Sequence, residues 1–201
     1  MNKILVIYAH PEAPPSRANR AIRHAAQHLF AASSTNPAIN KDALITWHDL
    51  YERYPDFHVS VSREQALLLD HDVLLFQHPF HWYSVPALLK LWIDEVLTDG
   101  WAYGGGAQAL AGKTWAHWVT AGGSAGAYQT GGQNNFSVQE LMRPLEQTAL
   151  LCGCHWQAPE FTFSSLTLDE TDLAVEGQRF ASFLLNLGRP NLPTSKVTDH
   201  A

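Results

Sequence analysis

Basic residues are few in this sequence, and they form no cluster. The chain of 201 residues has 13 Lys and Arg against 19 Asp and Glu, which gives a formal net charge of −6 at pH 7. Proteins that bind nucleic acid or acidic lipid carry a basic surface that neutralises phosphates, so this balance argues against both partners. Apolar runs of the roughly 20 residues that span a bilayer are also missing, and no apolar leader precedes the first expected strand. We therefore expect a cytoplasmic protein.

Cysteine is nearly absent as well. Cys152 and Cys154 are the only two, and their spacing matches neither a CxxC motif nor a disulfide framework. Two thiols cannot complete a zinc site, so we expect buried structural cysteines. The histidines, among them His78 and His81, belong to no HExxH motif or carboxylate-rich group that would hold a metal. The sequence therefore predicts no metal site.

Hydrophobic residues make up 46% of the chain, which is enough to bury a full core. Short β-prone apolar runs alternate with segments of helical periodicity, without a repeat or a break in composition. The expected strands are residues 3–9, 43–48, 72–77, 114–120 and 156–163, and the expected helices are residues 17–31, 63–70, 85–97, 138–151 and 169–187. This alternation predicts an α/β fold with a doubly wound, five-stranded parallel sheet and helices on both faces. We expect residues 1–190 to form one domain and residues 191–201 a loose tail.

Three loops, each after the carboxyl end of an expected strand, carry the candidate site. The first runs from His10 to Asn19 into a helix, whose N-terminal N–H groups and dipole favour an anion such as a phosphate. The second, residues 80–83, is crowded with rings, and open α/β sheets bind flat ligands at this edge. The third, residues 120–132, is rich in glycine, which lets backbone N–H groups approach a ligand. Taken alone, these loops also fit a helix cap at Ser16, a packed histidine and a flexible connector.

Other motifs compete with this interpretation. Residues 112–114 resemble the end of a P-loop, but the earlier glycine is replaced by Ala107, and a strand is expected to follow instead of a helix. Residues 122–126 match G-x-S-x-G, which in an α/β-hydrolase presents a nucleophile, here Ser124. Its conceivable partners are Asp169, Asp172, His155 and His200. No helix is expected directly after Ser124, so a serine hydrolase is the less favoured alternative. The first loop also lacks the G-x-G-x-x-G of a dinucleotide site and suits a mononucleotide better.

Seven short segments resemble, in the same order, the flavodoxin-like NAD(P)H:quinone reductases. They are Ala9-His10-Pro11, Ser16-x-Ala18-Asn19, Tyr54-Pro55-Asp56-Phe57, His78-Pro79 with Trp82-Tyr83-Ser84, Leu88-Leu89-Lys90-x-Trp92-Ile93-Asp94, Gly100-Trp101-Ala102-Tyr103-Gly104 and Thr120-x-Gly122-Gly123. The match runs from about Lys3 to Pro159. The branch that it resembles most is the ancillary subunits of the Kef-type glutathione-regulated potassium-efflux systems. The resemblance implies a flavodoxin-like fold with strand order 2-1-3-4-5.

The resemblance also implies a homodimer with one bound FMN per subunit, and the implied contacts fall in the three loops selected above. The FMN phosphate and ribityl chain would lie against His10, Ser16, Arg17, Ala18 and Asn19. The flavin ring would lie against Phe80, His81, Trp82 and Tyr83. The polar edge of the ring would lie against Thr120, Ala121, Gly122 and Gly123.

The implied activity is that of a flavin-dependent NAD(P)H dehydrogenase (quinone), in which NAD(P)H is the co-substrate and a quinone accepts two electrons in a ping-pong order. Tyr128 matches the active-site tyrosine of the family. The histidine that accompanies this tyrosine in some relatives is Gln133 or Asn134 here, and neither supplies an imidazole acid.

The Kef-type branch implies a partner as well, namely a membrane potassium-efflux antiporter. Through that partner the protein would lie on the cytoplasmic face of the inner membrane. An alternative of a different class follows, in which the chain is a flavin-binding regulatory subunit with little turnover.

Overall fold

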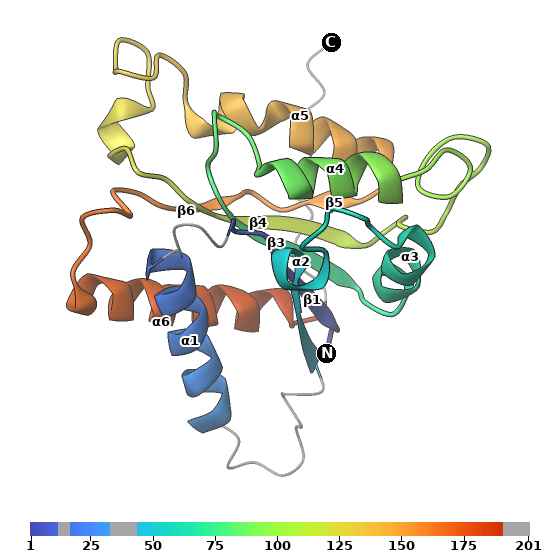
Figure 1. Cartoon of the computed structure of the whole chain (residues 1–201), viewed down its shortest axis with the longest axis horizontal. Coiled ribbons are helices and arrows are strands. Elements are labelled where there is room, and N and C mark those ends of the chain that lie inside the picture. The colour runs from blue at the N-terminus through green and yellow to red at the C-terminus, as the bar shows by residue number, and fades with distance from the viewer. Residues whose placement is uncertain (12–16, 33–43, 191–201) are drawn as a thin grey trace.

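A parallel sheet lies between two layers of helices (Figure 1). The computed structural model describes residues 1–11, 17–32 and 44–190. The strands are β1 (Ile4–Tyr8), β2 (Ile45–Asp49), β3 (Val73–Pro79), β4 (Thr114–Thr120), β5 (His155–Trp156) and β6 (Glu160–Thr162). They lie in the order β2-β1-β3-β4-β5, with β6 also paired to β4, and the pairings are parallel. The expected strand order and fold class are confirmed.

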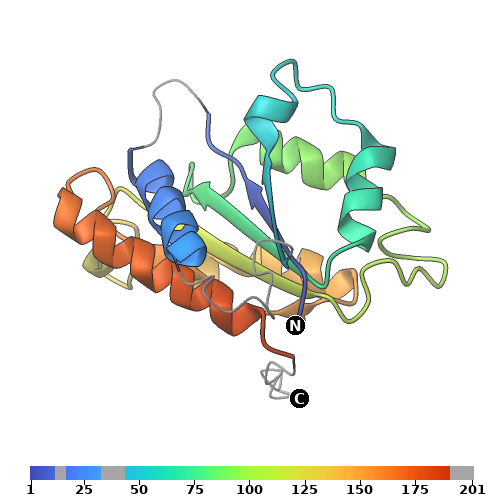
Figure 2. The same ribbon diagram turned by 90° about the horizontal axis from the view of Figure 1, so that it is seen from below.

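Helices cover both faces of the sheet, as the view from below also shows (Figure 2). They are α1 (Arg17–Ala32), α2 (Leu50–Arg53), α3 (Val61–Leu69), α4 (Ala87–Val96), α5 (Val138–Leu151) and α6 (Glu170–Leu187). Helices α1 and α6 pack on one face, and α4 and α5, with the shorter α2 and α3, pack on the other. Strands β1 and β3 are buried throughout because both of their faces are covered, which explains their nearly unbroken apolar sequences.

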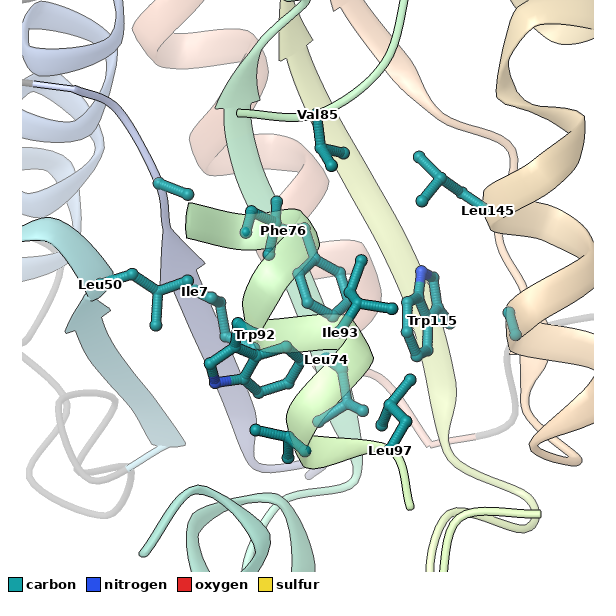
Figure 3. Close-up of a cluster of buried hydrophobic side chains, with 14 of the residues drawn as sticks. Ile7, Leu50, Leu74, Phe76, Val85, Trp92, Ile93, Leu97, Trp115 and Leu145 are labelled. Carbon is teal, nitrogen blue, oxygen red and sulfur yellow. The ribbon is translucent and has the colours of Figure 1, made fainter. Parts of the chain in front are cut away.

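The larger part of the core lies under α4, and a group of aromatic rings packs at its centre among aliphatic side chains (Figure 3). Phe76 of β3 has its ring centroid 5.8 Å from that of Trp92 and 4.6 Å from that of Trp115. All three side chains are fully buried. Such aromatic pairs add stability beyond the apolar area that they remove from water. This packing fixes α4 over the centre of the sheet.

On the opposite face, α1 is held close to α6. The glycine at position 177 of α6 makes this possible, because a Cβ atom there would lie 2.3 Å from the Cβ atom of Ala25 in α1. Any larger residue at position 177 would push the two helices apart. The close contact sets the position of α1 and therefore of Arg17, Ala18 and Asn19 at its start.

Two expected boundaries differ from the structure for clear physical reasons. The expected strand 156–163 is divided into β5 and β6, because Pro159 lies between them and has no N–H to continue the ladder. The expected helix 85–97 begins two residues later, since Pro86 occupies its N-cap position and Ser84 instead pairs with His81. The short helix α2 was not expected, and it is started by Asp49, whose side chain accepts hydrogen bonds from two backbone N–H groups.

Other expectations hold. The two cysteines are buried and not bonded to each other. Helix α5 begins with a capping box between Ser137 and Glu140. The expected tail, residues 191–201, lies outside the described residues. Among the residues that are described, no helix is both long and apolar enough to cross a membrane.

A buried carboxylate joins four elements of the larger core. Glu64 of α3 is completely buried and accepts hydrogen bonds from the hydroxyl of Tyr54 at 2.5 Å, Nε1 of Trp92 at 2.8 Å and Nε2 of His48 at 2.9 Å. Burial by itself would raise the pKa of the Glu64 carboxyl, but the hydrogen bond and charge of His48, with the other two donors, bring this pKa below its usual value. The charged form is therefore stabilised by the fold.

We expect Glu64→Leu to lower the free energy of unfolding by about 3 kcal/mol or more, because two buried donors and the partly buried His48 lose their acceptor. The contribution of Glu64 is present above the pKa of the unfolded carboxyl, about 4.3, and is lost as the pH falls through the lower pKa of the folded protein. Urea unfolding of the wild type and of Glu64→Gln at several pH values measures the contribution of the Glu64 carboxylate to the free energy of unfolding. The exposed Glu95→Gln is the matched control. Equal acid sensitivity of wild type and Glu64→Gln would contradict the assignment.

Candidate functional site at the carboxyl edge of the sheet

The three loops selected from the sequence meet at one edge of the sheet. His10 follows β1, Phe80 follows β3 and Ala121 follows β4, and these three strands are neighbours. The N–H of Phe80 donates to the carbonyl of Thr120 at 2.8 Å, which ties the second loop to the third. The rings of His10 and His81 lie edge to face with their centroids 6.2 Å apart, which brings the residue after β1 against the second loop. The expected convergence is confirmed.

The second loop presents its rings to solvent. Trp82 is 93% exposed and Tyr83 is 47% exposed, which is unusual for such large apolar side chains. Both residues have positive φ angles, 47° and 62°, in the left-handed region that residues other than glycine rarely adopt. Paired backbone hydrogen bonds between His81 and Ser84 hold this turn. Strained backbone that the surrounding structure maintains is typical of functional sites.

Two loops at this edge offer backbone donors. In the part of the chain that the structure describes, the N–H groups of Trp82, Tyr83, Gly122 and Gly123 donate to no protein acceptor. The first pair lies in the ring-rich turn and the second pair directly follows Ala121, whose own N–H is bonded to Thr162. A ligand with acceptor atoms along one edge would satisfy these donors.

Four rings near these donors pack against one another and form an aromatic wall, which consists of Phe80, Tyr128, Phe161 and Phe163. The ring of Phe80 lies 5.9 Å from that of Tyr128 and 5.7 Å from that of Phe161, and Tyr128 lies 5.8 Å from Phe163. Sequence reasoning missed Phe161 and Phe163. The signal was available, because both belong to the expected fifth strand, which pairs with the strand that leads into the third loop.

Tyr128 lies directly over Gly123. A Cβ atom on Gly123 would lie 3.1 Å from the tyrosine ring, so the absence of a side chain there sets the position of the phenol. Partial burial raises the pKa of the Tyr128 hydroxyl, and the nearby Tyr83 adds to this shift. The phenol therefore stays protonated at neutral pH and is able to donate a hydrogen bond. The hydroxyl of Tyr83 donates to Oδ1 of Asn134 at 3.3 Å, and sequence reasoning missed this contact too.

Three predicted site residues, Arg17, Ala18 and Asn19, form the start of α1, and their side chains are buried or bonded to other parts of the protein. Ala18 and Asn19 are buried, and Nδ2 of Asn19 donates to Oγ1 of Thr120 at 2.7 Å. This bond joins α1 to the end of β4 inside the protein. Arg17 donates to the carbonyl of Leu168 and forms an ion pair of 3.0 Å with Glu170. Ser16 lies outside the described residues.

A chain of polar groups runs through the core beneath the site. Nε1 of Trp115 donates to Nε2 of His117 at 2.8 Å, Nδ1 of His117 lies 3.0 Å from Nε2 of His78, and Nδ1 of His78 lies 3.0 Å from the carbonyl of Pro79. The indole is a donor only and the carbonyl an acceptor only, so each neutral imidazole carries its proton on Nδ1. Both histidines are fully buried. The chain ends at the residue before Phe80.

The structures that the competing motifs require are absent at their positions in the described residues. Ser124 is exposed and is followed by the 3-10 turn Ala125–Ala127, not by the helix that a nucleophile elbow needs. Gly112 lies in a turn before β4, so the helix of a P-loop is missing. Within residues 1–11, 17–32 and 44–190, no group of three or more His, Cys, Asp and Glu side chains is arranged to hold a metal.

Comparisons with known proteins agree with this geometry. The family model described as a flavodoxin-like fold matches residues 2–183. The glutathione-regulated potassium-efflux system ancillary protein KefG of Serratia proteamaculans (strain 568) is 45% identical over 161 residues, which are 80% of this chain and 81% of that protein. KefG of Pectobacterium carotovorum is 42% identical over 182 residues, which cover 90% and 92% of the two chains.

Two solved structures are similar over nearly the whole chain. General stress protein 14 of Treponema denticola, in complex with FMN, has a TM-score of 0.80 and 34% identity over 92% of this chain and 99% of that chain. An NADPH-quinone reductase from P. pentosaceus has a TM-score of 0.72 and 32% identity over 89% of this chain and 97% of that chain.

The buried histidine pair makes stability depend on pH. Burial lowers the pKa of His78 to about 4 and that of His117 well below its usual value. Unfolded imidazoles have a pKa of about 6.5, so acidification from pH 6.5 to 4 protonates the unfolded state first and lowers stability. For His78 alone the loss is about 3 kcal/mol at pH 4. Chemical unfolding across this range should show a smaller slope for His78→Phe combined with His117→Leu. The exposed His24→Gln should match wild type, and an unchanged slope in the double variant would disprove the role of the pair.

Proposed function

The chain belongs to the flavodoxin-like NAD(P)H:quinone reductase family, and from this premise we propose that it binds FMN and reduces quinones by two electrons at the expense of NAD(P)H. The single observation that carries the proposal is the set of backbone donors of Gly122 and Gly123 beside an aromatic wall. A flat ring with acceptor atoms along one edge fits this arrangement. The FMN complex of the Treponema protein supports the choice of ring.

The residues present fit an isoalloxazine. Among the described residues, the N–H groups of Gly122, Gly123, Trp82 and Tyr83 donate to no protein acceptor, so acceptor atoms of a ligand would satisfy them. When bound, FMN supplies the hydride chemistry. The donors of the third loop would stabilise negative charge on the reduced ring, because preorganised dipoles need little reorganisation. His10, with the start of α1, is proposed to hold the phosphate and ribityl chain.

Asn19 is proposed to act mainly through Thr120. Its side-chain amide fixes the hydroxyl of Thr120 at the start of the third loop, so it positions the Thr120–Gly123 backbone from inside the protein. Ala18 is buried beside it, which leaves backbone groups at this point as the contacts for a ribityl chain. Arg17 is bonded to Leu168 and Glu170, which ties the start of α1 to the start of α6.

Tyr128 is proposed as the catalytic hydrogen-bond donor to the acceptor. Its phenol is fixed over Gly123 and against Phe80, with the proton retained at neutral pH. A nicotinamide and a quinone would use one binding position beside the tyrosine in turn, which is a ping-pong order. Asn134, one of the two candidates for the missing histidine, is bonded to Tyr83, so it orders the loop and offers no acid.

A second role is favoured by the names of the relatives and by the surface. We propose that the protein also serves as the ancillary subunit of a potassium-efflux antiporter, as a homodimer, at the cytoplasmic face of the inner membrane. Trp82 of the second loop and Leu166, which lies beside Gly122, are exposed apolar side chains at the site, with Leu166 82% exposed, and such side chains suit contact with a protein. The alternative within this role is that the protein is a flavin-binding regulatory subunit that reduces little quinone.

Flavin binding gives the direct test. Full-length protein dialysed against FMN should retain about one flavin per chain, and the flavin band should bleach anaerobically with NADH or NADPH and recover with a soluble quinone. Thr120→Val should weaken retention, because it removes the acceptor of Asn19. Protein that binds no FMN would overturn the whole proposal. Bound flavin that remains oxidised would leave only the regulatory role.

Replacement of the catalytic phenol separates turnover from folding. Tyr128→Phe should lower quinone turnover by roughly tenfold, the effect of one lost hydrogen bond of about 1.4 kcal/mol in the transition state. Flavin content and Tm should stay at wild-type values, because the ring still packs on Phe80. Gly123→Ala should give a similar loss by displacing the ring, and Gly126→Ala, where a Cβ atom meets nothing within 4 Å, is its control. Wild-type turnover of Tyr128→Phe would show that the hydroxyl is dispensable.

A further inference from the structure

A groove unrelated to the flavin site runs along the border of the sheet. Strand β2 ends the strand order, so one of its two backbone edges has no neighbouring strand among the described residues, and Figure 2 shows it at the border of the sheet, followed directly by α2. The groove has a volume of about 580 Å³. Its described lining is Thr46, Trp47, His48, Asp49, Glu52, Arg53, Arg63, Ala66, Leu67 and Asp70, which come from β2, α2 and α3.

The groove runs along β2, since four successive residues of the strand, from Thr46 to Asp49, border it. Successive side chains alternate between the two faces of a sheet, so a lining of consecutive residues favours a position along the strand's backbone. The exposed backbone N–H and carbonyl groups of an edge strand lie there, and they are a template for another strand.

Charge defines what kind of strand fits. In the described part of the chain, Asp49 is paired with Arg23 and Asp70 with Lys3, and His48 is bonded to Glu64. The guanidinium groups of Arg53 and Arg63 have no ion pair within the same residues, and they stand on the α2 and α3 sides of the groove. The remaining charged group of the lining is the exposed Glu52 carboxylate. Two arginines without an ion pair among the described residues favour carboxylates on a ligand of this groove.

We propose that this groove binds an extended acidic peptide segment of a partner protein, which adds to β2 as a further strand of the sheet. Main-chain hydrogen bonds to β2 would supply affinity, and carboxylates that reach Arg53 and Arg63 would supply specificity. The five residues of β2 accommodate a strand of about 17 Å. Because the groove shares no residue with the flavin site, the proposal is independent of the redox function.

The test uses full-length protein and a fluorescein-labelled decapeptide of alternating valine and glutamate. Fluorescence anisotropy should show binding that weakens as the salt rises from 50 to 500 mM. The same peptide with lysine in place of glutamate should bind at least about tenfold more weakly, and so should the acidic peptide with alternate amides N-methylated, which cannot complete a strand ladder. In heteronuclear NMR spectra, the amide signals of Ile45–Asp49 should shift on addition of the acidic peptide.

Substitutions connect the binding to the groove. Arg53→Ala combined with Arg63→Ala should weaken the acidic peptide by about tenfold or more. Arg143→Ala, an exposed arginine on α5, should leave it unchanged. Circular dichroism and Tm show whether each variant is folded. The proposal is overturned if the acidic peptide fails to bind, if the N-methylated or lysine peptide binds equally well, if the double variant binds like wild type, or if the β2 amide signals do not move.

Discussion

The parallel register of β1, β3 and β4 is the constraint on which the rest of this structure depends. Ile4 lies opposite Val73, and Val73 lies opposite Thr114, so that the ladder ends with Pro79 opposite Thr120. That last pair sets Phe80 beside the third loop. A slip by one residue would turn every side chain to the other face, and Phe76 would leave the aromatic core under α4. The packing of Phe76 with Trp92 and Trp115 therefore stabilises both the core and the alignment of the three loops.

The polarity of the buried side chains changes along the central strands. Their amino-terminal halves are apolar, whereas their carboxyl ends bury His78 and His117 on one face and Gln77, Asn19 and Thr120 near the other. Buried polar groups are tolerated because they bond to one another, as in the chain from Trp115 to Pro79 and the bond from Asn19 to Thr120. These bonds have direction, which apolar packing lacks. They fix the loops above them at the point where the regular ladder stops.

Much of this arrangement followed from the sequence, because it rests on patterns that short segments carry. Strand order could be inferred from alternating elements and the resembling motifs, whereas the expected strand 156–163 missed the break at Pro159. The inward position of Asn19 was also readable, since it lies three residues before Ile22 and seven before Ala26 on one side of α1. The left-handed backbone of Trp82 and Tyr83 was not readable, because neither residue favours it. That conformation arises from the paired bonds between His81 and Ser84, which exist only once β3 and α4 are in place.

The exposed surface has a physical explanation in the same terms. Large apolar side chains are usually buried, but Trp82 is 93% exposed. The left-handed backbone of the turn directs its indole toward solvent. Left-handed backbone at two such residues costs of order 1–3 kcal/mol each, and exposing a large ring forfeits a further gain from burial. Both costs lower the stability of the folded protein, and both arise in one turn at the edge of the candidate site. A turn kept in this state by the tertiary structure is shaped for what it contacts and not for the stability of the chain itself.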